Sequence, residues 1–191
     1  NWNVRKLLLD CVESVRQQKN VRFEIIVIDN ASRDGSAEAL KERFPQVRLI
    51  ENKNNRGFAR ANNQGIRLAS GRHILLLNPD TIVQPDTLQK TVAFLDAHSD
   101  VGIIGCKILN RDGSRQRSIR RNPSLLSQAL ILLKMQAFFP NWRSLQKYFA
   151  TDFSYAREED VEQVMGAFLA FRASLTKSVG LLDEGYFLWF E

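Results

Sequence analysis

Two short polar clusters combine aspartate with asparagine, and these residue types can bind a divalent cation and a phosphorylated ligand. The first cluster is Asp29-Asn30 and the second is Asn78-Pro79-Asp80. Mg²⁺ and Mn²⁺ prefer oxygen ligands and share them with substrate phosphates, so we expect Asp80 to hold such a cation. We expect Asp29 to accept hydrogen bonds from a ribose or a base. The competing interpretation of Asp80 is a strand-end turn with a solvated carboxylate.

The segments before these clusters predict strands that deliver both aspartates to one place. Residues 23–28 and 73–78 are apolar runs typical of strands buried on both faces of a parallel sheet. Pro79 ends the second run, because proline lacks the N–H that a strand ladder needs. Ligands of open α/β sheets bind beyond the carboxyl ends of strands. Asp29 and Asp80 are therefore expected to face a common crevice.

The rest of the chain alternates between strand and helix patterns, which indicates an α/β fold with a mostly parallel sheet flanked by helices. Asn3 is expected to cap a first amphipathic helix, and Pro85 is expected to begin another that runs to about His98. Further strands are predicted at 47–51, 101–109 and 164–171, and further helices at 36–44, 58–69 and 173–179.

A polar loop at residues 55–65 is expected to run into the helix that begins near Phe58. Helix N-termini attract phosphates through their free N–H groups, and Gly57 would allow a phosphate to approach the backbone closely. The competing interpretation is an ordinary loop with a helix cap. The chain contains neither the G-x-G-x-x-G pattern of dinucleotide-binding proteins nor the Walker lysine motif.

Carboxylates near the end of the chain are surrounded by aromatic residues. Asp183, Glu184 and Glu191 lie among aromatic residues that include Trp189. An apolar environment raises the pKa of a carboxyl group toward the range of a general base, and aromatic rings suit the apolar faces of a sugar. The competing interpretation is a terminal segment that packs its rings into the core.

The composition predicts an anionic partner without identifying it. The 191 residues carry 27 Lys and Arg against 21 Asp and Glu, for a formal net charge of +6. Four arginines lie between residues 115 and 121, but no aromatic residues are interleaved with them, so we expect no nucleic acid partner. The apolar segment 125–139 is too short to cross a bilayer. We expect it either to pack on the sheet or, with the arginines, to lie on an anionic lipid surface.

The cysteines and the absence of a signal sequence favour a cytoplasmic protein. Cys11 and Cys106 have neither C-x-x-C nor metal-ligand spacing, so we expect reduced core residues. No leader or membrane-spanning run is visible. The predicted location is therefore the cytoplasm, with peripheral contact at the inner face of the cell membrane as the alternative that the lipid interpretation adds.

Five segments taken together resemble the family 2 glycosyltransferases, and in particular the rhamnosyltransferase-like members that build bacterial cell-surface polysaccharides. These segments are 23–36, 55–65, 77–81, 166–172 and 181–191. The resemblance implies a GT-A fold, which is a Rossmann-like nucleotide-sugar-binding domain. It also implies an inverting transfer of a sugar, rhamnose among the candidates, from a nucleoside diphosphate-sugar to a cell-surface polysaccharide or lipid-linked acceptor. Mg²⁺ or Mn²⁺ would assist.

The resemblance also implies roles for single residues. Asn78-Pro79-Asp80 would be the equivalent of the D-x-D motif, with Asp80 as the metal ligand, and Glu191 would be the first residue of the catalytic Glu-Asp pair. The donor would be bound by Asp29, Asn30, Asn55, Gly57, Asn62, Asn63 and Asn78. The acceptor side would include Gly166, Asp183, Glu184 and Trp189.

The chain departs from the family pattern in three respects. Asn78 replaces the first Asp of D-x-D, and Asn62 stands where many relatives carry an arginine. The family's first strand would lie before Asn1 and its catalytic base directly after Glu191, so we expect this polypeptide to be catalytically incomplete. On this interpretation residues 1–109 form the nucleotide-sugar-binding half of one domain and residues 110–191 an incomplete acceptor half. The alternative is a non-catalytic nucleotide- or glycan-binding domain of the same fold.

Overall fold

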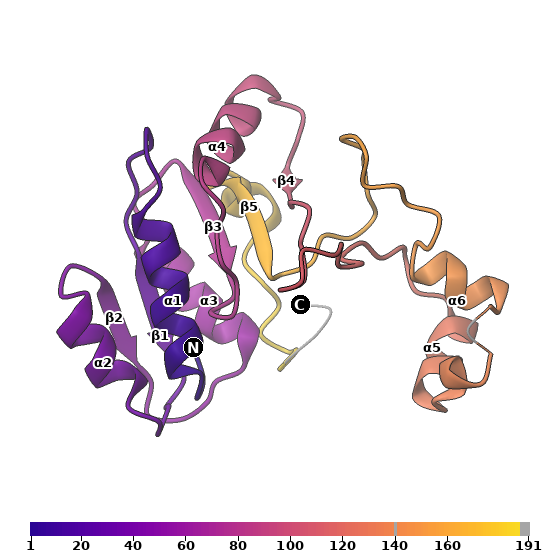
Figure 1. Cartoon of the computed structure of the whole chain (residues 1–191), viewed down its shortest axis with the longest axis horizontal. Helices are drawn as coiled ribbons and strands as arrows, with labels where there is room; N and C mark the ends of the chain where they lie inside the picture. Colours follow the sequence, from indigo (N-terminus) through magenta and orange to yellow (C-terminus); the bar gives the residue numbers. More distant parts are fainter. Residues whose placement is uncertain (140, 188–191) are drawn as a thin grey trace. The chain divides into compact units, whose positions relative to one another are not determined.

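The computed structural model describes residues 1–139 and 141–187, which form two compact units (Figure 1). The first unit comprises residues 1–104 and 170–187, and the second comprises residues 105–169. These structural bounds are distinct from the functional halves expected on either side of residue 109, which stay a prediction.

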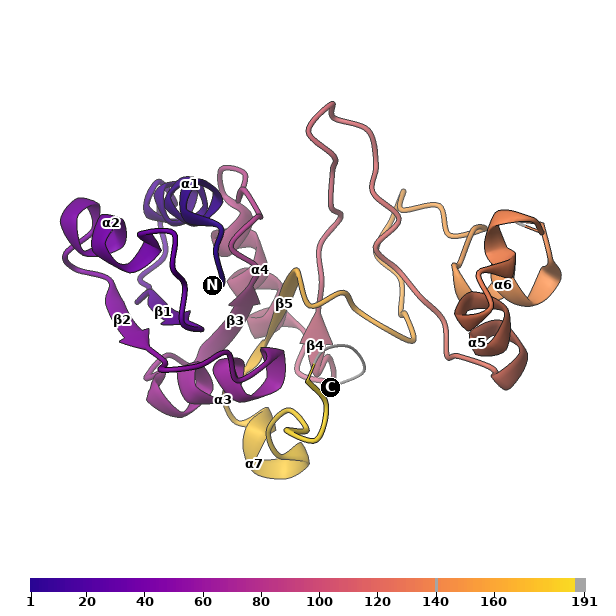
Figure 2. The ribbon, with the colours of Figure 1, turned by 90° about the horizontal axis from the view of Figure 1, so that it is seen from below.

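A parallel strand pair with helices on both faces forms the first part of the first unit. β1 (Ile26–Asp29) pairs in parallel with β2 (Arg48–Glu51). α1 (Arg5–Arg16) and α2 (Ser36–Arg43) lie on one side of the pair, and α3 (Phe58–Leu68) lies on the other (Figure 2). This layering is the α/β arrangement that the alternating patterns predict.

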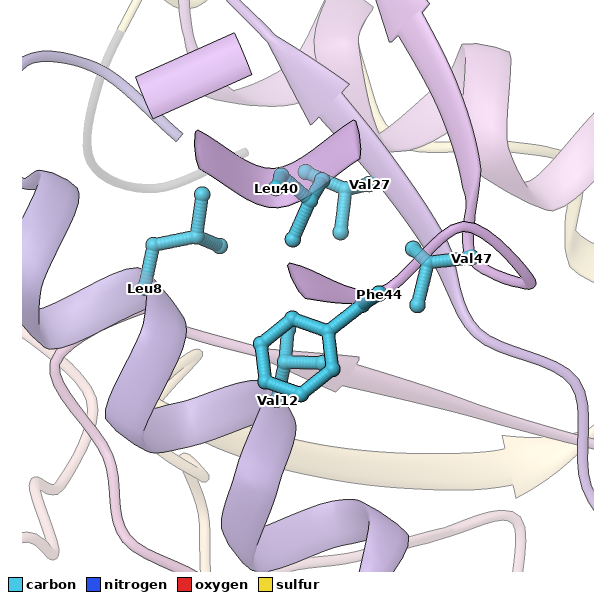
Figure 3. Packing of buried hydrophobic residues seen from close by; sticks show 6 residues of the cluster. All are labelled: Leu8, Val12, Val27, Leu40, Phe44 and Val47. Atoms are coloured by element: carbon cyan, nitrogen blue, oxygen red, sulfur yellow. The ribbon is translucent and has the colours of Figure 1, made fainter. Parts of the chain in front are cut away.

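Alternating side chains of β1 explain why both faces are covered. Val27 packs into the cluster between α1 and α2, whereas Ile28 approaches Gly65 of α3. The apolar positions of α1 recur at helical spacing and point at the same cluster. Figure 3 shows this cluster, which consists of Leu8, Val12, Val27, Leu40, Phe44 and Val47.

The second sheet of the chain has the order β3-β5-β4. β3 (His73–Leu77) neighbours β5 (Phe168–Arg172), and β4 (Ile103–Ile104) pairs antiparallel with β5. The helices α4 (Thr87–Ala97) and α7 (Leu175–Val179) follow β3 and β5 along the chain. The α/β class is thus confirmed, with β1 and β2 parallel and β4 and β5 antiparallel.

Two predicted helix starts are wrong. α1 begins at Arg5 after Val4, while Asn3 has a φ of 53° and its side chain accepts a hydrogen bond from the Arg33 N–H instead of capping the helix. α4 begins at Thr87, two residues after Pro85, and its N-cap Asp86 lies in the left-handed region. In both cases a tight turn that local propensity does not reveal precedes the helix.

The predicted strand 101–109 is also largely wrong, because only Ile103 and Ile104 are in strand β4. Glycines at positions 102 and 105 bound this pair, and glycine weakens a strand interior. Asn110 and Ser114 do close the predicted turn, with the Asn110 N–H donating to the Ser114 carbonyl at 2.8 Å and Gly113 at a φ of 81°.

The second unit contains the apolar segment of the sequence. This segment forms α5 (Leu125–Leu132) and a short 3₁₀ helix, η1 (Met135–Ala137), and α6 (Arg143–Tyr148) follows. Ser124 caps α5 by accepting a hydrogen bond from the Ser127 N–H. Within the described residues, no helix is long and apolar enough to cross a membrane.

We expect Leu40→Ala to lower the free energy of unfolding by about 2–5 kcal/mol, because Leu40 is 1% exposed and its truncation leaves a cavity between α1 and α2. Urea unfolding would measure the change. Ile82→Ala is the control, since Ile82 is 53% exposed and its truncation should change stability by less than about 1 kcal/mol. Equal losses for both variants would contradict the position of the core.

Candidate functional site

Asp29 lies at the carboxyl end of β1, where the sequence predicts it, and is 3% exposed. One carboxylate oxygen accepts hydrogen bonds from the Ser32 hydroxyl at 2.6 Å and from the Asn1 side-chain amide at 2.7 Å. The other accepts from the Ser32 N–H at 2.9 Å. The carboxylate therefore organises the turn after β1.

Asn30 joins this turn to the ends of β2 and the beginning of α3. Its amide donates to the Gly57 carbonyl at 3.2 Å, and its side-chain oxygen accepts from Asn52 at 2.9 Å. Asn52 and Gln64 of α3 exchange two further side-chain hydrogen bonds, at 2.8 and 3.0 Å. This amide network positions the loop that precedes α3.

Asp80 follows β3 and is exposed. No ion pair holds it within residues 1–139 and 141–187. The backbone before it is anchored, because the Asn78 carbonyl accepts hydrogen bonds from the Thr81 N–H at 3.1 Å and from the Cys11 thiol at 3.6 Å. Asp80 is thus presented to solvent from a turn that packs on α1.

The charges of Asp80 and Asp29 affect the pKa values of two groups near the start of the chain, the Cys11 thiol and the Asn1 amino group. Burial, and then the negative charge of Asp80, raises the pKa of the Cys11 thiol to about 12, against the opposing charge of the Asn1 amino group. Burial lowers the pKa of that amino group, and the carboxylate of Asp29 acts in the opposite direction. Asp80 and Asp29 thus each act on a group near the start of the chain, Asp80 on Cys11 and Asp29 on Asn1.

Asp80 has the chemistry that a magnesium or manganese ion requires when a diphosphate supplies further ligands. Among the residues that the structure describes, no three His, Cys, Asp and Glu side chains gather into a metal site. Mg²⁺ is commonly held by one or two carboxylates together with substrate phosphates. The exposed Asp80 carboxylate fits this mode of binding, and it does not fit a site made of protein ligands alone.

Gly57 lies where the last described residue of the chain contacts α3. The Phe58 N–H donates to the Phe187 carbonyl at 2.9 Å, and a Cβ on Gly57 would lie 2.7 Å from that oxygen. Gly57 has φ 81° and ψ 176°, a conformation that is essentially restricted to glycine. Asn55 fixes the turn by accepting a hydrogen bond from the Gly57 N–H at 2.9 Å.

The two asparagines of α3 differ in their contacts. Asn62 donates to the Phe58 carbonyl one turn earlier, at 2.9 Å. Asn63 is 1% exposed and bonds to both the N–H and the carbonyl of Leu182 and to the Glu184 carboxylate at 3.0 Å. These contacts favour a positioning role for Asn63 over direct contact with a donor.

Glu184 forms a charged cluster with two arginines of α3. Its carboxylate lies 3.3 Å from Arg67 and 3.7 Å from Arg60. The hydrogen bond from Asn63 is the main cause that lowers the pKa of Glu184, and the charges of the two arginines act in the same direction. A low pKa opposes the expectation of a general base at this carboxylate.

A polar hollow of about 610 Å³ lies beside this cluster. It is bounded by the loop before α3 and by residues 184–187, and its cations are Lys53, Arg56 and Arg60. Asn55 and Glu184 line it, whereas Asp29 and Asp80 do not. The predicted donor residues thus fall into two adjoining groups, one at the strand ends and one at this hollow.

The remaining predicted residues have different positions. Asp183 is exposed and accepts a hydrogen bond from the Gly185 N–H at 2.8 Å, and Gly166 lies in the second unit. Trp189 and Glu191 lie outside the described residues. The predicted roles of these residues stay predictions.

Four polar residues that the sequence reading overlooked hold the site together. Asn52 and Gln64 complete the amide network, and Arg60 and Arg67 bind Glu184. The only local signal is the density of amide and arginine side chains between residues 52 and 67. The contact with Glu184 spans more than a hundred residues and is invisible to local patterns.

Comparison with known proteins identifies relatives along nearly the whole chain. The family model described as glycosyl transferase family 2 matches residues 1–177. The chain is 30% identical over 183 residues to the N-acetylglucosaminyl-diphospho-decaprenol L-rhamnosyltransferase of Mycobacterium tuberculosis, covering 87% of this chain and 57% of that protein. It is 31% identical over 137 residues to the succinoglycan biosynthesis protein ExoO of Rhizobium meliloti, covering 68% and 39% respectively.

Solved structures share the fold. The mannosyltransferase PcManGT from Pyrobaculum calidifontis, in complex with GDP-Man and Mn²⁺, matches with a TM-score of 0.63 at 20% identity. The match covers 96% of this chain and 46% of the mannosyltransferase chain. S. aureus TarS in complex with UDP has a TM-score of 0.64 at 17% identity and covers 99% and 50%. The chain therefore spans about half the length of each.

We expect Gly57→Ala to destabilise the first unit by more than about 2 kcal/mol, because the new methyl group combines a glycine-only conformation with a clash against Phe187. Gly35→Ala is the matched control, since Gly35 also precedes a helix at positive φ but lies in the left-handed region with only an ordinary 3.5 Å contact. Its cost should be about 1–2 kcal/mol. Urea unfolding of both variants would compare them, and equal costs would contradict the contact with Phe187.

We expect the stability difference between the wild type and Glu184→Gln to depend on pH. Because the pKa of Glu184 is lowered from 4.5 in the folded chain, its ionised form stabilises the fold above pH 4.5, and this contribution is lost as the pH falls through the folded value. Thermal unfolding should show a difference in melting temperature between the two proteins at neutral pH, and this difference should disappear as the pH is lowered. A difference in melting temperature that does not change with pH would mean that the contacts with Arg67 and Asn63 do not act through the charge of Glu184.

Proposed function

This chain belongs to glycosyl transferase family 2, and on that premise we propose that it forms the donor-binding part of an inverting glycosyltransferase. The observation that carries the proposal is that Asp29 and Asp80 each lie at the carboxyl end of a strand, Asp29 at the end of β1 and Asp80 just after β3. Ligands of α/β sheets bind beyond such strand ends. The substrate would be a nucleoside diphosphate-sugar, with rhamnose among the candidate sugars.

Within this proposal, the strand ends and the hollow receive different parts of the donor. The turn organised by Asp29 and Asn30 would receive the nucleoside, and the exposed Asp80 would lie at the diphosphate. Asn55 and the cations of the hollow, Lys53, Arg56 and Arg60, would attract the remaining negative charge of the donor. The GDP-Man and UDP in the structural neighbours support the choice of this ligand class.

Asp80 would hold a Mg²⁺ or Mn²⁺ ion, whose charge stabilises the diphosphate as it leaves. The chain's own amide network would keep the loop before α3 in place while the donor binds, since Asn30 and Asn52 are bonded to its backbone and to α3. Preorganised polar groups of this kind lose little free energy in reorganising during the reaction.

Sugar transfer would proceed as a single displacement at the anomeric carbon. An acceptor hydroxyl oxygen forms a bond to this carbon while the bond to the diphosphate oxygen breaks on the opposite face, which inverts the configuration. The hydroxyl proton would pass to a carboxylate at or next to Glu191. Asn63 would position residues 182–184, because it bonds to Leu182 and Glu184.

The acceptor is proposed to be a cell-surface polysaccharide or a lipid-linked glycan. This proposal is supported by the relatives, whose names refer to a diphospho-decaprenol rhamnosyltransferase and to succinoglycan biosynthesis. A lipid-linked acceptor would bring the protein to the inner face of a cell membrane, where its contact would be peripheral.

We expect Asp80→Asn to abolish the Mn²⁺-dependent part of donor binding, because the variant keeps the shape of the side chain and removes its charge. Thermal shift measurements with a panel of nucleoside diphosphate-sugars, with and without Mn²⁺, would identify the donor and quantify the loss. Asp86→Asn is the control, since Asp86 is an exposed aspartate of the same segment.

Donor stabilisation that is equal in Asp80→Asn and the wild type would overturn the metal site. Stabilisation by the donor without any turnover of it in a full-length protein would favour the alternative, a non-catalytic nucleotide-binding domain of the same fold.

A further inference from the structure

The second unit exposes a set of large apolar side chains on consecutive elements. Leu125 and Leu132 of α5 are 93% and 82% exposed, and Leu133 and Phe138 are 70% and 76% exposed. Phe139 and Trp142 follow at 49% and 43%. Large apolar side chains exposed on neighbouring elements mark an interaction surface. We call these six residues the apolar patch.

The packing of the second unit does not account for the apolar patch. Leu130 of α5 and Leu145 of α6 are 6% and 1% exposed, and Ser127 of α5 is also buried. Six of the eight residues of α5 are apolar, and the leucines at both of its ends are exposed. A helix of this kind is expected in a core or against lipid.

The charged residues near the apolar patch indicate which kind of partner it binds. Residues 123–149 contain no acidic residue and three basic ones, Lys134, Arg143 and Lys147. All three are exposed, and none is in an ion pair within the described part of the chain. Exposed cations beside apolar side chains complement a surface that is negatively charged above and apolar below.

Two of the four arginines that the sequence suggested for this role have partners within the protein. Arg121 pairs with Asp152 at 2.7 Å. Arg120 lies over the ring of Phe149 at 5.0 Å and donates to the carbonyls of Arg117 and Ile119. The cations on the same elements as the apolar patch are instead Lys134, Arg143 and Lys147.

Aromatic residues give the patch a hollow. Phe139 and Trp142 meet edge to face with their ring centroids 5.4 Å apart, and with Phe138 and Asn141 they bound a shallow hollow of about 420 Å³. Aromatic side chains favour the boundary between lipid headgroups and acyl chains. The hollow suits the insertion of an acyl or isoprenoid chain from that boundary.

We propose that α5, η1 and the start of α6 form a docking surface for an anionic lipid bilayer. The apolar patch lies in the boundary region of one leaflet, and Lys134, Arg143 and Lys147 contact acidic headgroups. The surface would hold the protein beside a lipid-linked acceptor, and only this purpose rests on the proposed function. Lipid binding itself requires neither donor nor transfer.

Co-sedimentation of the chain with vesicles tests the proposal. The chain should bind vesicles of phosphatidylcholine mixed with phosphatidylglycerol and bind phosphatidylcholine vesicles at least about tenfold more weakly, because each cation near an anionic surface contributes about 1 kcal/mol. The variant Lys134→Gln/Arg143→Gln/Lys147→Gln should lose at least about tenfold in binding to the anionic vesicles. The matched control Lys6→Gln/Lys19→Gln/Lys90→Gln loses the same number of positive charges as this variant but outside the patch, and it should bind like the wild type.

A second variant tests the apolar contribution. Leu132→Gln/Leu133→Gln should bind the anionic vesicles at least about tenfold more weakly. Ile82→Gln/Val179→Gln, at positions 53% and 72% exposed, should not. Absence of vesicle binding, or equal losses in the variants and their controls, would overturn the proposal.

Sedimentation equilibrium separates this surface from a self-association interface. If Leu132→Gln/Leu133→Gln converts a dimer to a monomer and leaves vesicle binding unchanged, the apolar patch joins two copies of the chain and the lipid proposal is wrong. Donor-dependent thermal shifts should be the same in all these variants. A failure of lipid binding is thereby distinguishable from a failure of the proposed donor site.

Discussion

The buried side-chain amide of Asn30 connects three elements on which the candidate site depends. It donates to the Gly57 carbonyl ahead of α3 and accepts from Asn52 beyond β2, while its own residue follows β1. Asn30 is 7% exposed, and a buried amide that loses a partner costs about 1–3 kcal/mol. The ends of both strands and the loop before α3 are therefore held in one arrangement, and Asp29 is held with them.

This constraint explains why the site can be polar and still well ordered. The carboxylate of Asp29 and the amides of Asn52 and Asn63 have partners within the protein, so burial does not leave them unsatisfied. Asp80 is different, because it is exposed at the end of a turn anchored on α1. The buried groups give the site its shape, and the exposed carboxylate is the group that remains available to a ligand.

Local sequence patterns predict the elements of the first unit and the position of its aspartates. The apolar runs at residues 23–28 and 73–78 contain β1 and β3, but β1 begins only at Ile26, because Phe23 is 41% exposed and the start of the run is not buried. The predicted strand 101–109 shrinks to two residues, since glycines interrupt it and Ile103 is 45% exposed. The left-handed turn at Asp86 has no comparable signal in composition.

Long-range contacts account for most of what the sequence leaves undetermined in the site. Glu184 looks like a candidate base when it is considered among its aromatic neighbours in the sequence. Its contacts with Asn63 and Arg67, more than a hundred residues away, instead lower its pKa and make it part of an ion-paired cluster. The same reasoning applies to Arg121, whose charge pairs with Asp152. Charge counts along a sequence cannot distinguish such paired groups from free ones.

The central claim is that the carboxyl ends of β1 and β3 bind one nucleoside diphosphate together with one divalent cation. A crystal structure of the chain with a nucleoside diphosphate and Mn²⁺ tests this claim most directly. We expect the cation between Asp80 and the phosphate oxygens, with the nucleoside against the turn of Asp29 and Asn30. A nucleotide bound away from both strand ends, or a cation bound without contact to Asp80, would contradict the account.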